Sequence, residues 1–138
     1  MPSPTRVFQN QGFIMKFKNL LKSFKYAIRG IVFVYKNEQN FRLQFFSSLV
    51  VLFFTWYFPL SKGECVVIIL LIFLVLILEL FNTAVEKLID VMKPRLSFQI
   101  EVVKDIMASV VLMSAIVSVL IGVIIFYPYF VVLISQKW

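Results

Sequence analysis

Four polar residues share one face of an otherwise apolar segment. Glu79, Asn82, Glu86 and Asp90 follow an uncharged run over residues 65–78. On a helix they fall within about 80° of one another. An acid in a membrane-spanning helix is costly unless it faces protein, water, a partner or an ion. Because three carboxylates on one stripe repel each other, protonation or a bound cation would relieve them, and an oxygen-only ligand set favours Mg²⁺.

Two further polar groups stand at the start of other apolar segments. Glu101, Lys104 and Asp105 precede one of them, and Glu38 and Arg42 precede another. Taken with the first stripe, they gather carboxylates, an amide and a lysine at one predicted membrane face. This set of side chains is suited to holding a metal–nucleotide at the surface of a bilayer.

Simpler interpretations of these residues stay open. Glu79 and Glu86 also fit a helix that merely leaves the membrane there, with Lys87 and Lys104 as their ion-pair partners. Glu38 and Arg42 also fit an ordinary i,i+4 pair of modest strength. Asn82 is harder to explain in this way, because a buried amide needs hydrogen-bond partners.

The composition restricts the kind of protein that positions these residues. Of 138 residues, 61% are apolar and 15% are charged. This apolar share exceeds the roughly 45–50% of soluble domains and excludes a disordered chain. A single cysteine, Cys65, excludes an intrachain disulfide, and the absence of histidine leaves zinc without its usual ligands. The composition therefore indicates a small integral membrane protein.

The apolar runs predict an all-α membrane protein with an N-terminal amphipathic surface helix followed by three transmembrane helices. The spans are expected at about 43–60, 65–92 and 102–127, each near the roughly 17–25 residues that a bilayer requires. Residues 16–36 predict the surface helix, because apolar positions recur every three or four residues and lysines occupy the other face. Residues 1–15 are expected to be a disordered extension, 16–134 a single domain and 128–138 a tail.

Charge asymmetry predicts the orientation. Residues 1–42 hold eight basic residues and one acid, and the connection between the second and third spans is also basic. The positive-inside rule then places the N-terminus and this connection in the cytoplasm. We expect a multi-pass protein of a bacterial inner (plasma) membrane, whose net charge of +7 serves anionic lipid rather than nucleic acid.

The pattern Glu79-x-x-Asn82-Thr83-Ala84-Val85-Glu86-x-x-Ile89-Asp90 closely resembles the signature of the prokaryotic diacylglycerol kinase family. These are very small integral-membrane lipid kinases. The resemblance covers about residues 16–126. Further similar stretches are residues 23–30 of the surface helix, Glu38-x-x-Phe41-Arg42, and Val103-Lys104-Asp105.

The resemblance implies a role for each polar residue. Glu79 matches the catalytic base for the lipid hydroxyl, and Arg42 is expected beside it at the lipid substrate. Glu38 and Glu86 match the carboxylates that hold Mg²⁺ on ATP. The remaining matches complete the nucleotide and phosphate site: Asn82, Asp90, Lys104 and Asp105. Family members form homotrimers with shared sites.

The implied function is ATP- and Mg²⁺-dependent phosphorylation of a membrane lipid alcohol, undecaprenol or diacylglycerol. Ala108 and the stretches around residues 24–30 and 40–42 favour the undecaprenol branch. A non-enzymatic assembly or regulatory protein stays open, because the connection over 94–99 lacks the acid and histidine usual in the family. Val103 and Gln44 also depart from the family pattern. An ion or proton carrier built on Glu79 is disfavoured, because no polar path continues through the outer half of the spans.

Overall fold

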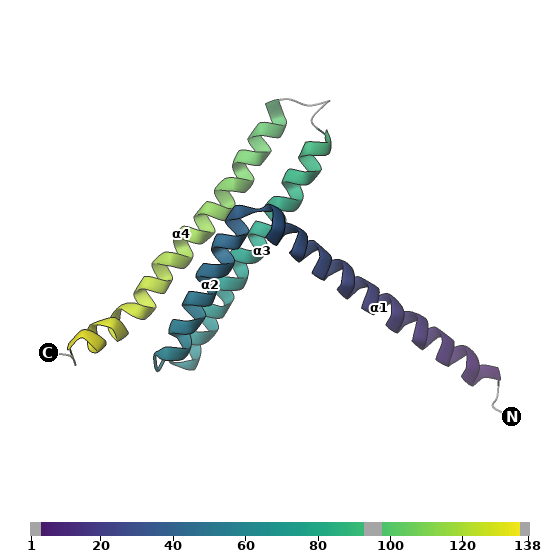
Figure 1. The fold of residues 1–138 in the computed structure, drawn as a ribbon, viewed down its shortest axis with the longest axis horizontal. Helices are drawn as coiled ribbons and strands as arrows, with labels where there is room; N and C mark the ends of the chain where they lie inside the picture. Colours follow the sequence, from purple (N-terminus) through teal and green to yellow (C-terminus); the bar gives the residue numbers. More distant parts are fainter. Residues whose placement is uncertain (1–3, 93–97, 136–138) are drawn as a thin grey trace. The chain divides into compact units, whose positions relative to one another are not determined.

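The chain forms four helices in a computed structural model that describes residues 4–92 and 98–135. They are α1 (Pro4–Asn37), α2 (Gln39–Tyr57), α3 (Lys62–Met92) and α4 (Phe98–Ser135) (Figure 1). The all-α expectation is confirmed. The helices divide into two compact units, Met1–Asn37 and Glu38–Trp138.

The first unit consists of helix α1. The helix begins at Pro4, so that its backbone is already helical over most of the region expected to be disordered. Proline is tolerated in a first turn because its missing N–H would have no partner there. At the other end, the Asn37 side-chain amide donates to the carbonyl oxygen of Phe33 at 2.7 Å. This bond satisfies one of the carbonyl groups that a helix end leaves unpaired.

The second unit is built around α3, which packs against both α2 and α4. Helices α2 and α3 run antiparallel and are joined by a short connection after Tyr57 (Figure 1). Helix α3 begins with a capping box: the Ser61 N–H donates to the Glu64 carboxylate at 2.8 Å, and the Glu64 N–H donates to the Ser61 hydroxyl at 3.3 Å. The Tyr129 hydroxyl of α4 also donates to Glu64, at 2.9 Å. One carboxylate therefore ties this end of α3 to α4.

An aromatic cluster holds the three helices together at the same end of the unit. Phe58, Ile68 and Phe126 form its buried core. The ring of Phe58 lies 5.0 Å from that of Phe130, and the ring of Phe54 lies 6.3 Å from that of Phe126, centroid to centroid. These contacts join α2, and the residue that follows it, directly to α4.

Helix α4 continues beyond the predicted end of the third span. It runs through Pro128 to Ser135, in part of the region expected to be a tail. Proline leaves the carbonyl of Ile124 without its usual donor, but the apolar residues that follow sustain the helix. The connection expected at 94–99 lies mostly outside the described residues, since 93–97 are not described and α4 begins at Phe98.

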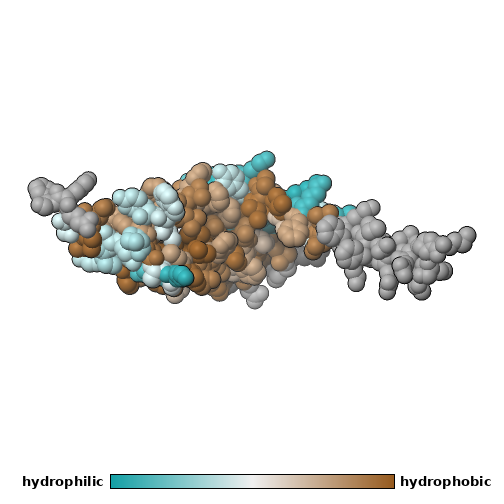
Figure 2. Space-filling model, turned by 90° about the horizontal axis from the view of Figure 1, so that it is seen from below, coloured by the Kyte–Doolittle hydropathy of each residue, from teal (hydrophilic) through white to brown (hydrophobic). Residues whose placement is uncertain are grey.

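Among the described residues, two helices are long and apolar enough to cross a membrane, over Lys62–Val91 and Ile100–Ser135. In their most apolar windows only 17% and 0% of the residues are buried, so these helices are not the core of a soluble bundle. Hydrophobic residues dominate much of the coloured surface in Figure 2. Helix α2, which corresponds to the first predicted span, falls short by this measure. Its first two turns contain Gln39, Asn40, Arg42 and Gln44.

Candidate functional site

Glu79 is buried inside the second unit. Only 3% of its surface is exposed, although the side chain is a carboxylate on the long apolar helix α3. The Gln44 side chain of α2 donates from Nε2 to Glu79 Oε2 at 3.1 Å. Burial of an acid is stabilised only where polar partners replace water, and the Gln44 carboxamide supplies one such partner. Of the surroundings that the sequence analysis left open for Glu79, the structure shows protein.

Asn82 and Thr83 are the other buried polar residues of α3, at 9% and 2% exposure. Asn82 Nδ2 donates to Glu86 Oε1 at 3.4 Å, one helical turn away. The Asn82 carbonyl oxygen Oδ1 is buried and has no hydrogen-bond partner among the described residues. Because buried polar atoms are almost always paired, this oxygen marks a position where a further donor or cation is to be expected.

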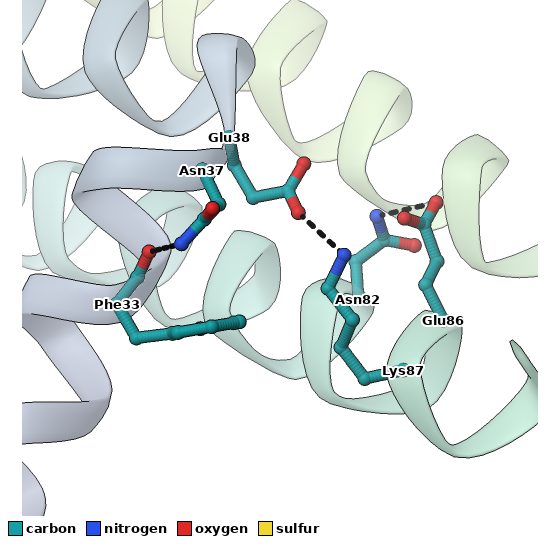
Figure 3. A network of polar contacts seen from close by, with 6 residues as sticks. All are labelled: Phe33, Asn37, Glu38, Asn82, Glu86 and Lys87. Atoms are coloured by element: carbon teal, nitrogen blue, oxygen red, sulfur yellow. Dashed lines mark hydrogen bonds and ion pairs between the residues drawn. The ribbon is translucent and has the colours of Figure 1, made fainter. Parts of the chain in front are cut away.

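Glu38 approaches α3 from the start of α2. Its Oε1 lies 3.2 Å from the Lys87 ammonium, with the two side chains 23% and 48% exposed. Figure 3 shows this ion pair beside the Asn82–Glu86 hydrogen bond. Lys87 had been considered as a partner for Glu79 or Glu86 on its own helix, and the structure instead gives it a partner on α2. The Arg42 backbone N–H donates to the Glu38 carbonyl at 3.4 Å, within the first turn of α2.

Three carboxylates share this region. Glu86 and Glu38 each lie near enough to Glu79 for their negative charges to interact with its carboxylate. The structure therefore places Glu38 and Glu79, which are 41 positions apart in the sequence, in the same region. A site of this charge attracts cations.

The remaining predicted site residues lie near the end of α3 and the start of α4, on either side of residues 93–97. Asp90 lies near the end of α3 and is exposed. Lys104 is half-buried and Asp105 exposed in the first turns of α4. Within the described residues, the Lys104 and Asp105 side chains make no hydrogen bond or ion pair with the carboxylates of α3. The Asp105 carbonyl accepts a hydrogen bond from the Ser109 hydroxyl at 2.7 Å.

The donor set fits a cation that is bound jointly with a substrate. In the described part of the chain no group of three or more acidic, cysteine or histidine residues is close enough to hold a metal by itself. Mg²⁺ is commonly held by one or two carboxylates together with substrate phosphates, rather than by a cage of protein ligands. Glu38 and Glu86 supply two such carboxylates, and each uses one oxygen in its contact with Lys87 or Asn82.

Two residues of the site, Gln44 and Thr83, were not predicted as site residues from the sequence. Gln44 was noted only as a departure from a family pattern, and Thr83 only as part of a motif. The signal for Gln44 was an amide placed between Leu43 and the apolar remainder of α2. Its partner on α3 was not predictable, because the periodicity of one helix does not fix the register of its neighbour.

Comparisons with a family model and with curated proteins all find the same family of lipid kinases. The family model described as "Prokaryotic diacylglycerol kinase" matches residues 25–126. An undecaprenol kinase of Bacillus subtilis is 36% identical over 107 residues, which cover 78% of this chain and 87% of that protein. A diacylglycerol kinase of Synechocystis is 34% identical over 105 residues, 75% of this chain. A Haemophilus influenzae diacylglycerol kinase is 35% identical over 72 residues, 52% of this chain. The matches span only 60% and 61% of these last two proteins.

Proposed function

The chain belongs to the prokaryotic diacylglycerol kinase family, and from this premise we propose that it transfers a phosphoryl group from ATP to the hydroxyl of a membrane lipid alcohol. The relatives are named for diacylglycerol and undecaprenol, so both lipids are candidate acceptors. We favour undecaprenol, because the similar B. subtilis protein carries that name and the stretches around residues 24–30 and 40–42 resemble that branch.

One observation supports the proposal most strongly: the buried carboxylate of Glu79 in an apolar bundle, within Coulombic reach of Glu38 and Glu86. Acids at such depth are expensive, and they characterise functional sites. A structural role alone does not explain three carboxylates in one region, since their mutual repulsion destabilises the fold. A reaction that uses a base and a bound cation explains all three.

Each residue then has a chemical role. Glu79 takes the proton of the lipid hydroxyl as that oxygen attacks the γ-phosphorus, and ADP leaves with the electron pair of the broken bond. Glu38 and Glu86 would hold Mg²⁺, which neutralises charge on the ATP phosphates when it is bound. Asn82, Asp90, Lys104 and Asp105 face the nucleotide, with Lys104 toward phosphate. Arg42 lies on the lipid side.

The membrane supplies the arrangement in which these groups work. Helices α3 and α4 cross the bilayer, and α2 crosses beside them with its polar first turns at the cytoplasmic boundary. Helix α1 lies on the cytoplasmic surface through its apolar stripe, with its lysines among anionic headgroups of the bacterial inner membrane. The lipid hydroxyl at headgroup level and ATP in the cytoplasm then meet at Glu79.

A homotrimer completes the site in this proposal. Each chain has only three packed helices with which to shield its carboxylates, and many of its large apolar side chains are exposed. Packing against other copies covers part of this surface and surrounds the charged groups with protein. Within the described residues, Lys104 and Asp105 make no hydrogen bond or ion pair with Glu79 or Glu86, and in a trimer they can meet the site of a neighbouring copy.

The test is phosphate transfer by the purified protein in detergent or lipid. Radiolabelled ATP and Mg²⁺ are supplied with undecaprenol and diacylglycerol in parallel, and EDTA is the control for the metal. We expect label in at least one lipid, with loss of transfer in EDTA. Transfer to neither lipid would refute the proposed function and favour a non-enzymatic protein.

A further inference from the structure

Helix α4 is longer than a bilayer is thick. Its uncharged part runs from Ile106 to Ser135 and measures about 45 Å at about 1.5 Å per residue. The hydrocarbon core of a bilayer measures about 30 Å and is crossed by about 17–25 helical residues. Even a tilt of about 40°, the upper end for membrane helices, leaves this part of α4 longer than the core. Some of its apolar residues therefore lie outside the hydrocarbon.

The Tyr129 hydroxyl shows which end of α4 carries the excess. It donates to the Glu64 carboxylate at 2.9 Å, and Glu64 is bonded in turn to Ser61 in the connection from α2 to α3. A non-helical connection that contains charges belongs at the membrane boundary, because lipid leaves its polar groups without partners. Tyr129 lies at the same level, so residues 106–129 suit the crossing in length and residues 130–135 extend past it.

Residues 130–135, the terminal segment of α4, continue the helix and are apolar except for Ser135. All six are exposed in the unit, and the exposed fraction of Val132 is 52%. Pro128 stands just before them, and proline is the commonest cause of a bend in a helix. Figure 1 shows the last turns of α4, drawn in yellow, turned away from α2 and α3. A bend at this level directs the segment along the membrane boundary rather than into water.

Aromatic residues near the segment indicate the same boundary. Trp56 and Tyr57 end α2, Tyr127 precedes Pro128 on α4, and all three are exposed. Tryptophan and tyrosine gather at the headgroup level, because their rings are apolar while their N–H and O–H groups are polar. The terminal segment therefore starts within a layer of side chains suited to lipid headgroups.

We propose that the terminal segment, turned at Pro128, lies between the headgroups and acyl chains of the leaflet farther from Glu79 and anchors α4 at its depth in the membrane. The partner is a lipid surface, because apolar side chains surround the segment, whereas a partner helix would cover only one stripe of it. The inference goes beyond the proposed function: the family model ends at residue 126, and no step of phosphate transfer uses the segment.

The depth of the segment can be measured by tryptophan fluorescence in the full chain. Trp56→Phe and Trp138→Phe remove the native indoles, and Val132→Trp adds one on the terminal segment. The protein is placed in phosphatidylcholine vesicles whose lipid carries bromine, a quencher, either near the headgroup or near the end of the acyl chain. We expect the headgroup-side bromine to quench the Val132→Trp indole more strongly than the deep bromine.

The matched control is Val117→Trp in the same background. Val117 is also an exposed valine of α4, but it lies midway along residues 106–129, so the deep bromine should quench its indole more strongly. Both variants should melt at the temperature of their parent. A Val117→Trp indole that neither lipid quenches would refute the membrane crossing of α4 and the proposal with it.

The other outcomes for Val132→Trp overturn the proposal. Emission at long wavelength without quenching by either lipid would place the segment in water. Emission at short wavelength without such quenching would mean that protein, such as a second copy of the chain, covers it. Stronger quenching by the deep bromine would place it in the hydrocarbon core.

Pro128→Ala tests the bend separately. Alanine restores the N–H that proline lacks and lets the helix run straight. We expect the Val132→Trp indole then to be quenched less by brominated lipid and more by acrylamide in the water. Unchanged quenching would refute the role assigned to Pro128. None of these measurements depends on phosphate transfer, so their failure and that of the proposed function are distinguishable.

Discussion

The Glu38–Lys87 ion pair permits a test that separates fold from metal binding. Replacing Glu38 by Gln removes a carboxylate proposed to hold Mg²⁺, and replacing Lys87 by Gln removes its partner. Both changes break the same contact of 3.2 Å. Because the side chains are 23% and 48% exposed, the pair contributes at most about 1 kcal/mol to the free energy of unfolding. Both variants should therefore melt within roughly 2–8 °C of the unmodified protein.

The effect on activity should differ sharply between the two variants. Loss of a residue that only supports a metal ligand already costs about 10–100-fold in metal affinity, and loss of the ligand itself should cost at least as much. We expect Glu38→Gln to raise the Mg²⁺ concentration for half-maximal transfer by at least about tenfold. Lys87→Gln should leave it unchanged or lower it, because the Lys87 ammonium competes with the metal for the Glu38 carboxylate and repels the cation.

The assay is the initial rate of phosphate transfer to lipid over a series of Mg²⁺ concentrations, alongside a thermal melt of each variant. Equal Mg²⁺ dependence in the two variants would refute the reasoning in either of two ways. If both are normal, Glu38 does not hold the metal. If both are impaired, the ion pair matters rather than the carboxylate.

Three further outcomes follow from the structure. Glu86→Gln should abolish transfer with little change in melting temperature, because Gln retains an acceptor for Asn82; near-normal turnover would remove Glu86 from the metal site. Phe58→Ala, a change in the buried aromatic cluster, should lower the free energy of unfolding by about 3–5 kcal/mol, which denaturation in detergent measures, and an unchanged stability would contradict the packing role assigned to this cluster. Crosslinking in native membranes should yield three chains, and a fully active monomer would contradict shared sites.

Much of the site was predictable because it lies on one helix. The spacing of Glu79, Asn82 and Glu86 places them on one face of α3 whatever surrounds the helix, and an acid within so apolar a segment has to face protein, water, a partner or an ion. The burial of Glu79 and Asn82 agrees with that expectation. The signature around these residues also identified the family.

Contacts between helices were less predictable. The sequence offers several partners for Lys87, and only the register of α2 against α3 selects Glu38. The same register brings Gln44 to Glu79. Helix ends were uncertain for another reason, since composition predicts where apolar runs stop but not where a backbone ceases to be helical. The extents of α1 from Pro4 and of α4 past Pro128 show this difference.

The central claim is that buried Glu79 serves as the base in phosphate transfer to a lipid. The most direct measurement compares Glu79→Gln with the unmodified protein in one preparation, with nucleotide binding measured by calorimetry and transfer to lipid measured as a rate. Glutamine retains the shape and an acceptor for the Gln44 amide but takes no proton. We predict unchanged binding of ATP–Mg²⁺ and a transfer rate lower by about 10²-fold or more. Retained transfer would contradict the account, and loss of both binding and transfer would make Glu79 a structural or metal-linked residue instead.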